Sequence, residues 1–130
     1  IIHGAANAMY LPKVIAFNAK DPVAKARYGV IADYMHLEGK TDDEKVKNLI
    51  AYLRKMNDEL NIPHCIQHYG LDSYPTEVGF VPEKVFLERV DEIAKNAILD
   101  ACTGSNPRQP SQEEMVKLLK CCYYDTEVDF

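Results

Sequence analysis

Several classes of signal are missing from this sequence. No apolar run reaches the roughly 18 residues that a membrane-spanning helix needs, and the N-terminus lacks the basic start and cleavage pattern of a secretory signal peptide. Charges of both signs are interspersed, with 15 basic and 20 acidic residues and a formal net charge of -5. This balance favours neither a nucleic-acid partner nor a membrane surface. The sequence therefore predicts a cytoplasmic protein that binds no nucleic acid and no membrane.

The motifs of common enzymes and metal sites are also missing. The four cysteines, Cys65, Cys102, Cys121 and Cys122, show neither a CxxC spacing nor companion histidines at zinc-ligand spacing. We expect reduced thiols, and we expect the adjacent pair to face different sides of a helix rather than to react together. No glycine-rich phosphate loop follows a strand, no HExxH is present, and no order of Ser, His and Asp suggests a hydrolase. These patterns assign no catalytic residue to the chain.

Helical periodicity dominates what the sequence does contain. A chain of 130 residues that is 47% hydrophobic can form one compact domain over residues 1–130. Alternating strand patterns are nearly absent, which predicts an all-α fold with about five main helices. The first helix is expected over Ala5–Asn18, and Pro12 predicts a kink or a break near Leu11, because proline removes a backbone hydrogen bond. Asp21 suits the cap of a second helix, from Pro22 to about Met35.

Two capping boxes mark further helix starts. Thr41 with Glu44 opens a third, amphipathic helix that closes before Pro63, and Ser111 with Glu114 opens the last helix. Residues 62–81 contain two prolines, two glycines and no sustained period, so we expect a loop-rich stretch with room for one short helix. A long helix from Pro82 should bury one face, made of Val90, Ile93, Ala94, Ala97, Ile98 and Ala101. The last helix should turn Met115, Leu118, Leu119 and Cys122 inward, and the tail 123–130 should extend along the surface.

Few side chains suggest a function from spacing alone. His3 stands at the start of the first helix, where capping or packing is the commoner role and a place in a binding site is the alternative. Arg108 lies in a turn of Asn, Pro and Gln residues before the last helix, so we expect it to hold that turn by hydrogen bonds. We assign no role to His36, His64 and His68, which we expect to be solvated in loops or at helix ends.

Two long segments carry a family resemblance. They are "HGAANAMYLPKVIAFNA" near the start and "DACTGSNPRQPSQEEMVKLLKCCYY" near the end, with "RYGVIADYM" and "LNIPHCI" in matching order between them. Together they resemble the C-terminal helical part of the iron-containing, or group III, alcohol dehydrogenases over essentially the whole chain. Within that family the chain looks most similar to the alcohol dehydrogenase half of bacterial bifunctional aldehyde-alcohol dehydrogenases. Lactaldehyde reductases and butanol dehydrogenases share the "CTGxNPR" pattern and are the alternatives.

The resemblance implies a site that this chain would complete rather than contain. In the family an N-terminal α/β domain binds NAD(P)H, and one aspartate and three histidines hold a divalent metal, Fe2+ first and Zn2+ as a substitute. The last of those histidines belongs to the "HG" pair, which makes His3 the implied metal ligand. Cys102 matches a position near the substrate cavity, with a plain buried thiol as the alternative. Asn7 is a candidate for contacts with backbone groups or around the metal ligand, with a polar contact in the core as the equal alternative.

The implied reaction is hydride transfer between NAD(P)H and a small aldehyde or primary alcohol. The other three metal ligands and the glycine-rich cofactor segment would lie upstream of Ile1 in a longer parent, so we expect the isolated chain to be inactive and to bind neither metal nor nucleotide. The resemblance also implies a homo-oligomer. The alternative is a helical assembly module that acts without catalysis.

Overall fold

The structure is a computed structural model that describes residues 1–71 and 79–130. Five α-helices and two short 3₁₀ helices account for the regular structure of the described residues, which contain no strand, so the all-α prediction is confirmed. None of the helices in those two ranges combines the length and the apolar character needed to cross a membrane. In chain order the elements are α1 His3–Asn18, α2 Pro22–Tyr34, α3 Asp42–Glu59, η1 Ile66–His68, α4 Glu83–Leu99, η2 Thr103–Ser105 and α5 Gln112–Tyr124.

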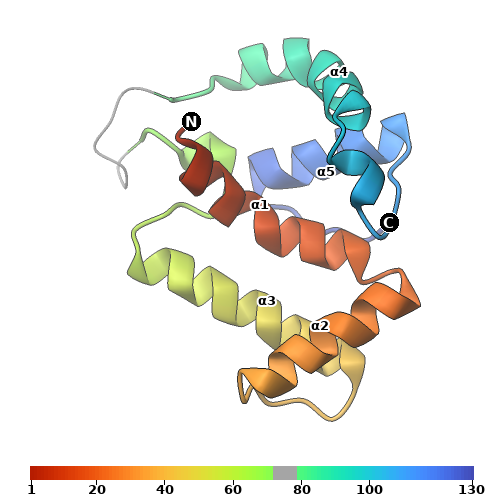
Figure 1. Cartoon of the computed structure of the whole chain (residues 1–130). Coiled ribbons are helices and arrows are strands. Elements are labelled where there is room, and N and C mark those ends of the chain that lie inside the picture. Colours follow the sequence, from red (N-terminus) through yellow and green to blue (C-terminus); the bar gives the residue numbers. More distant parts are fainter. Residues whose placement is uncertain (72–78) are drawn as a thin grey trace.

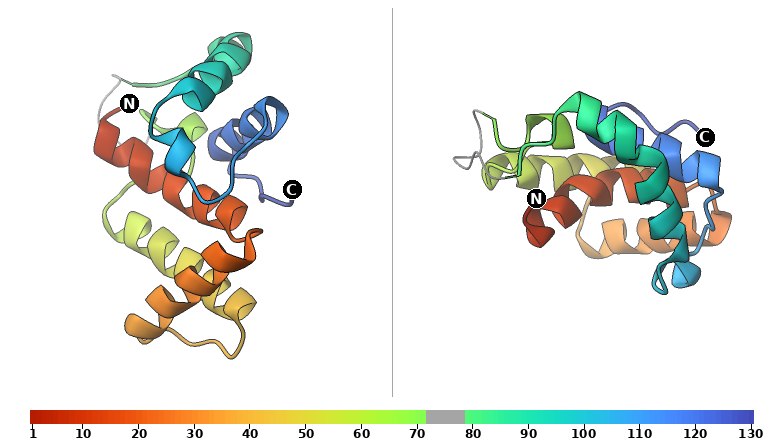
Figure 2. Two further views of the ribbon diagram at one scale, coloured as in Figure 1. Left: turned by 45° about the vertical axis from the view of Figure 1, so that its right-hand side comes forward. Right: turned by 90° about the horizontal axis from the view of Figure 1, so that it is seen from above.

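Helix α1 runs through the middle of the molecule. Figure 1 and the left view of Figure 2 show α2 and α3 packed together on one side of α1, and α4 and α5 packed together on the other. One core cluster joins α1 to α2 and α3 through Ile15, Ala32, Val46 and Leu49. A second cluster joins η1, α4 and α5 through Ile66, Phe86, Val90, Cys122 and Tyr123. The central position of α1 means that residues along its length touch both halves of the fold.

The three predicted helix caps are confirmed. The Asp21 carboxylate accepts a hydrogen bond from the backbone N–H of Ala24 at 2.8 Å, which satisfies one of the free donors at the start of α2. Complete capping boxes open α3, through Thr41 and Glu44, and α5, through Ser111 and Glu114. These local signals set where the helices begin.

Pro12 does not break α1, which continues without interruption from His3 to Asn18. Since proline has no N–H, the carbonyl of Ala8 one turn earlier loses its helical partner. The side-chain amide of Asn57, which is buried in α3, donates a hydrogen bond to that Ala8 oxygen at 2.9 Å. A side chain from a second helix therefore replaces the missing backbone donor, and the expected break does not occur.

Two expectations about the C-terminal half are wrong. Helix α4 ends at Leu99, so Ala101 lies beyond it, and of the six residues predicted for its inner face only Val90 and Ala94 are buried, while Ile93 is exposed. The tail prediction placed residue 123 on the surface, but Tyr123 is still within α5 and only 1% exposed. Its ring stacks on Phe86 with centroids 4.1 Å apart, which explains why the chain buries it.

The loop-rich stretch is confirmed where the structure describes it. Residues 62–71 and 79–81 contain one short helix, η1, and residues 72–78 of the predicted loop lie outside the described residues. On the near side of that gap Tyr69 is fully buried against Ala5 and Met9 of α1. This stretch therefore packs on the start of α1, where His3 lies.

Candidate functional site

His3 is the first residue of α1 and is exposed. The preceding residue, Ile2, is extended and caps the helix with no side-chain hydrogen bond. One turn further on, Nδ2 of Asn7 lies 3.0 Å from Nε2 of His3, within hydrogen-bond distance. The contact expected between Asn7 and the candidate ligand is therefore present. An amide nitrogen only donates, so Nε2 is the acceptor in this pair, and a metal bound at Nε2 would take the place of the Asn7 amide.

The start of α1 is held by the loop that follows α3. The backbone N–H of Ile2 donates to the hydroxyl oxygen of Tyr69 at 3.2 Å. Gly79 packs against the Tyr69 ring so closely that an added Cβ would lie 2.6 Å from a ring carbon, and its φ of +111° also disfavours other residues. The position of His3 thus depends on residues more than 60 positions away in the sequence.

At the start of α1, His3 provides a single imidazole that could bind a metal. In the described residues no group of three or more His, Cys, Asp or Glu side chains converges as a metal site would require. The donor chemistry and the exposure of His3 fit one ligand of a shared site. They do not fit a site complete within residues 1–71 and 79–130.

Below His3, one face of α1 borders an apolar hollow. Asn7, Tyr10, Val14 and Phe17 follow His3 at helical spacing and line a hollow of about 510 Å³. Its opposite walls come from α4, the η2 segment and α5, including Leu118 and Leu119. Cys102 lies on the rim of this hollow and is exposed. The alternative that Cys102 is a buried thiol is therefore wrong, whereas its role beside a substrate stays a prediction.

Side-chain hydrogen bonds hold the segment that carries Cys102. The backbone N–H of Cys102 donates to the Asp100 carboxylate at 2.8 Å, which ends α4, and the Thr103 hydroxyl donates to the carbonyl of Ala97 at 2.6 Å. The Gln109 amide reaches three backbone carbonyls of the same segment, at 2.7 to 3.3 Å. The rim of the hollow is therefore built by its own polar side chains.

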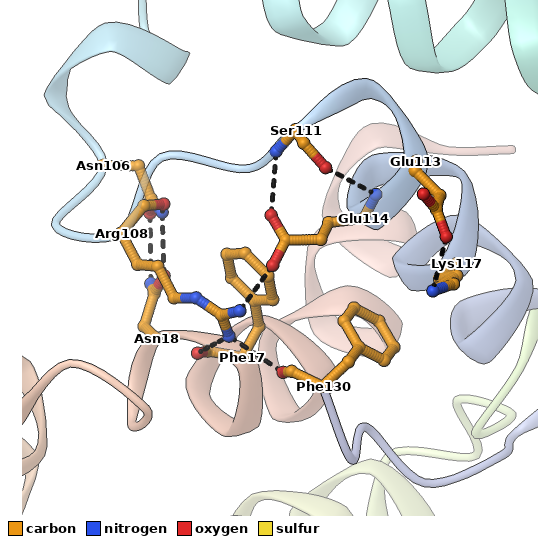
Figure 3. A network of polar contacts seen from close by, with 9 residues as sticks. All are labelled: Phe17, Asn18, Asn106, Arg108, Ser111, Glu113, Glu114, Lys117 and Phe130. Carbon is orange, nitrogen blue, oxygen red and sulfur yellow. Dashed lines mark hydrogen bonds and ion pairs between the residues drawn. The ribbon is translucent and has the colours of Figure 1, made fainter.

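Arg108 connects this segment to α1, α5 and the C-terminal residues, as Figure 3 shows. Its guanidinium donates to the carbonyl oxygens of Phe17 and Phe130, both at 2.9 Å, and pairs with Glu114 at 2.6 Å. It also lies over the Phe17 ring, 3.8 Å from the centroid. The structural role predicted for Arg108 is confirmed.

Beside Arg108, two asparagines pair through both of their amide groups. Asn18 at the end of α1 donates to Asn106 at 3.0 Å, and Asn106 donates back at 2.7 Å (Figure 3). Asn18 is buried, and its amide also donates to the Tyr28 hydroxyl, so the pair satisfies polar groups that water does not reach. Sequence reasoning missed this contact, because 88 residues separate the partners and nothing local signals it.

A second polar cluster joins the C-terminal end of α5 to α1 and α3. Asp125 ends α5 in the left-handed conformation, with a φ of 58°, and its carboxylate accepts two hydrogen bonds from Arg54, both at 2.7 Å. Lys13, which is only 8% exposed, lies 2.8 Å from the same carboxylate. Burial alone would raise the pKa of Asp125, but the hydrogen bonds and positive charges of Arg54 and Lys13 lower it to about 2.

The remaining histidines and cysteines fall into two groups. His36 and His68 are exposed, as expected. His64 is half-buried instead, with Nδ1 2.7 Å from Arg54 and Nε2 2.7 Å from an Asp58 oxygen, although the latter contact lacks hydrogen-bond geometry. All four cysteines are free, and Cys121 and Cys122 are both buried. Burial first, and the neighbouring Cys121, raise the pKa of Cys122 to about 12, so this thiol stays protonated.

The comparison with protein families gives the class of the chain. The sequence profile of the "Fe-containing alcohol dehydrogenase family, C-terminal" matches residues 1–123. The all-α architecture and the position of His3 agree with the resemblance that the sequence carries. The chain belongs to the iron-containing alcohol dehydrogenase family and corresponds to the C-terminal domain.

The chain is also similar to individual enzymes of this family. It is 45% identical over 130 residues to the NADPH-dependent butanol dehydrogenase of Clostridium saccharobutylicum, a match that covers 100% of the chain and 30% of the relative. It is 35% identical over 139 residues to the bifunctional aldehyde-alcohol dehydrogenase of Escherichia coli, covering 95% and 14%. The aldehyde-alcohol dehydrogenase of Clostridium acetobutylicum is 38% identical over 133 residues, covering 92% and 14%. The chain thus spans less than a third of each of these relatives.

Proposed function

We propose that this chain is the C-terminal helical domain of an NAD(P)-dependent alcohol dehydrogenase that interconverts small aldehydes and primary alcohols in the cytoplasm. The observation that carries the proposal is the exposed His3 imidazole at the start of α1, in a chain whose family is iron-containing. The relatives include both kinds of parent, and identity is higher with the butanol dehydrogenase, at 45%, than with the bifunctional enzyme of Escherichia coli, at 35%. A longer parent would supply the coenzyme domain and the other metal ligands.

Within that enzyme, the residues of this chain have four tasks. His3 would hold one coordination position through Nε2, and Asn7 would remain beside the ring, one turn further along α1. Bound Fe2+ or Zn2+ would supply Lewis-acid polarisation of the aldehyde oxygen for hydride transfer from the nicotinamide. Cys102, at the rim of the hollow, contributes to the wall beside the substrate. The polar segment between α4 and α5 keeps that wall in place through its own hydrogen bonds.

An activity assay of the purified chain tests whether the rest of the catalytic site lies outside this chain. With NADH or NADPH, butanal and added Fe2+ or Zn2+, we expect no oxidation of the coenzyme above the rate without protein, because His3 supplies one of the three or four protein ligands that such metals take. The full-length enzyme assayed in parallel should oxidise the coenzyme. Turnover by the chain alone would show that its catalytic site is complete without further domains.

Self-association is a second candidate function, and helix α2 favours it. The solvent-facing side of α2 carries Val23, Val30, Ile31 and Tyr34, the last of them 86% exposed, around the exposed Arg27. The inner side of the same helix buries Ala24 and Ala32. Four exposed apolar side chains on one helix suit a covered position, and a second copy of this chain would cover them.

Analytical ultracentrifugation tests self-association through α2. We expect the chain to form dimers that dissociate on dilution, and Val30→Asp to make it monomeric, because a carboxylate in an apolar interface loses its hydration without gaining a partner. Leu60→Asp changes an equally exposed residue at the end of α3 and should leave the dimer intact. A monomeric wild-type chain, or equal dimerisation of Val30→Asp, would contradict this function.

A further inference from the structure

The start of α1 lacks the local signals that hold other helix starts in this chain. Ile2, at the N-cap position, makes no side-chain hydrogen bond, and the first turn carries no acidic residue. Gly4 adds backbone freedom within that turn. Helices α3 and α5, by contrast, begin with complete capping boxes. A helix start without a cap frays unless groups from elsewhere in the fold hold it.

Tyr69 supplies such a group from the loop that follows α3. Its hydroxyl oxygen accepts a hydrogen bond from the backbone N–H of Ile2 at 3.2 Å, across 67 positions of the sequence. The side chain is fully buried against Ala5 and Met9. The backbone N–H of Tyr69 donates in turn to the carbonyl of Ile66 at 3.1 Å. Because the ring is buried and its backbone is anchored, the hydroxyl has a fixed position and can fix the backbone of Ile2.

Tyr69 contacts the face of α1 that lies opposite His3. Ala5 and Met9, on which the ring packs, lie about 200° around the helix axis from His3 and Asn7, since each residue turns an α-helix by about 100°. Tyr69 therefore does not approach the imidazole itself. It can act on His3 only through the backbone, by way of the neighbouring residue Ile2.

The side chain of His3 has little else to hold it. Its hydrogen-bond partner within residues 1–71 and 79–130 is the Asn7 amide, 3.0 Å from Nε2, and a metal bound at Nε2 would displace that amide. Both residues are also exposed, so no packed wall restrains the ring. The direction of the imidazole then depends on the backbone at the start of α1, which Tyr69 holds.

We propose that Tyr69 is a positioning residue for the metal site: through the backbone of Ile2, its hydroxyl fixes the direction in which the imidazole of His3 points. The inference rests on the proposed function, because it requires His3 to be a ligand, and it extends that function to a residue that does not touch the metal. When the start of α1 frays, only a fraction of the molecules presents His3 correctly. The apparent Kd for the metal rises in inverse proportion to that fraction.

The Tyr69→Phe variant of the full-length enzyme tests the proposal, because phenylalanine keeps the buried ring and removes only the hydroxyl. We expect the Kd of the metal-free enzyme for Zn2+, measured by competition with a chelator, to rise by about 2- to 10-fold. Hydrogen exchange, measured by mass spectrometry, should become faster at the backbone amides of residues 2–6. At saturating Zn2+ the kcat should equal that of the wild type, because every ligand is still present.

Tyr123→Phe is the matched control. Tyr123 is also buried, at 1% exposed, and its hydroxyl donates to the carbonyl of Val81 at 2.9 Å. This variant loses a hydrogen bond of the same kind, in a contact that does not include the start of α1. It should lower the Tm about as much as Tyr69→Phe and keep the wild-type Kd for Zn2+ and the wild-type exchange at residues 2–6.

A wild-type Kd for Zn2+ in the Tyr69→Phe enzyme would overturn the positioning role. An equal rise in Kd for Tyr123→Phe would also overturn it, because the effect would then be a general loss of stability. His3→Ala distinguishes this failure from a failure of the proposed function. If His3→Ala weakens Zn2+ binding and Tyr69→Phe does not, only the positioning role is wrong. If neither variant weakens it, His3 is not a ligand and both proposals are wrong.

Discussion

Replacing His3 with alanine in the full-length enzyme is expected to lower kcat/KM for butanal by about 1,000-fold, since a Lewis acid in the active site stabilises the transition state by several kcal/mol and each 1.36 kcal/mol is a factor of ten. The physical reason is the loss of the proposed metal ligand, since the imidazole of His3 is exposed at the start of α1, where it can meet groups from outside this chain. Metal content per subunit, measured by mass spectrometry of the purified enzyme, should fall in parallel with activity.

His68→Ala is the matched control for this prediction. His68 is also exposed, but it ends η1 and has no proposed contact with a metal. This variant should keep the metal content and kcat/KM of the wild type. A His3→Ala enzyme with full metal content and wild-type kcat/KM would remove His3 from the proposed site, whatever family the chain belongs to.

The second large effect is on stability, at Asp125. Replacing Asp125 with alanine should lower the free energy of unfolding at pH 7 by about 3 kcal/mol, as measured by urea denaturation. Lys13 and Arg54, whose side chains are only 10% and 28% exposed, would lose their shared carboxylate, and unpaired charges of this kind are costly. Alanine would also have to adopt a φ of 58°, which costs about 1 kcal/mol for a residue with a Cβ and no compensating contact.

The Asp125→Asn variant distinguishes the effect of the carboxylate charge on stability from the effect of the left-handed backbone conformation. Asparagine tolerates the left-handed conformation and can still accept hydrogen bonds, so this variant should lose about 1–2 kcal/mol, less than alanine. The folded pKa of Asp125 is about 2, below the ordinary value of 3.8, so its stabilising effect is present above pH 3.8 and is lost as the pH falls towards 2. The stability difference between wild type and Asp125→Asn should therefore shrink over that interval. A difference that stays constant from pH 5 to 2 would contradict the charge assignment.

Local signals in the sequence predicted the helix starts, because the responsible groups are neighbours along the chain. Thr41 and Glu44 satisfy each other's backbone within four residues, and Ser111 and Glu114 do the same. Helix ends and buried faces were harder to predict. The Asp100 side chain, by bonding to the Cys102 N–H, ends α4 before Ala101, and periodicity alone gives no sign of this competition.

The candidate site likewise has a part that the sequence predicted and a part that it did not. Spacing alone left His3 undecided between a helix cap and a ligand, and the family resemblance is what singled it out. The hollow beside it was not predictable, because Tyr10, Ala97 and Leu119 meet only after α1, α4 and α5 have packed. The bonds that join Lys13 to Thr126 and Asn18 to Asn106 connect residues 113 and 88 positions apart, and such contacts leave no periodic trace in a single sequence.

The bond between Asn57 and the carbonyl of Ala8 bears on how this chain can change over evolution. Losing Asn57 alone would strand the carbonyl that Pro12 leaves unpaired, inside the contact between α1 and α3. Losing Pro12 alone would return an N–H to that carbonyl, whose second lone pair can still accept from the buried amide of Asn57. The asparagine is therefore required while the proline is present, but the proline is not required by the asparagine, so in related chains the proline should be lost before the asparagine and not after it.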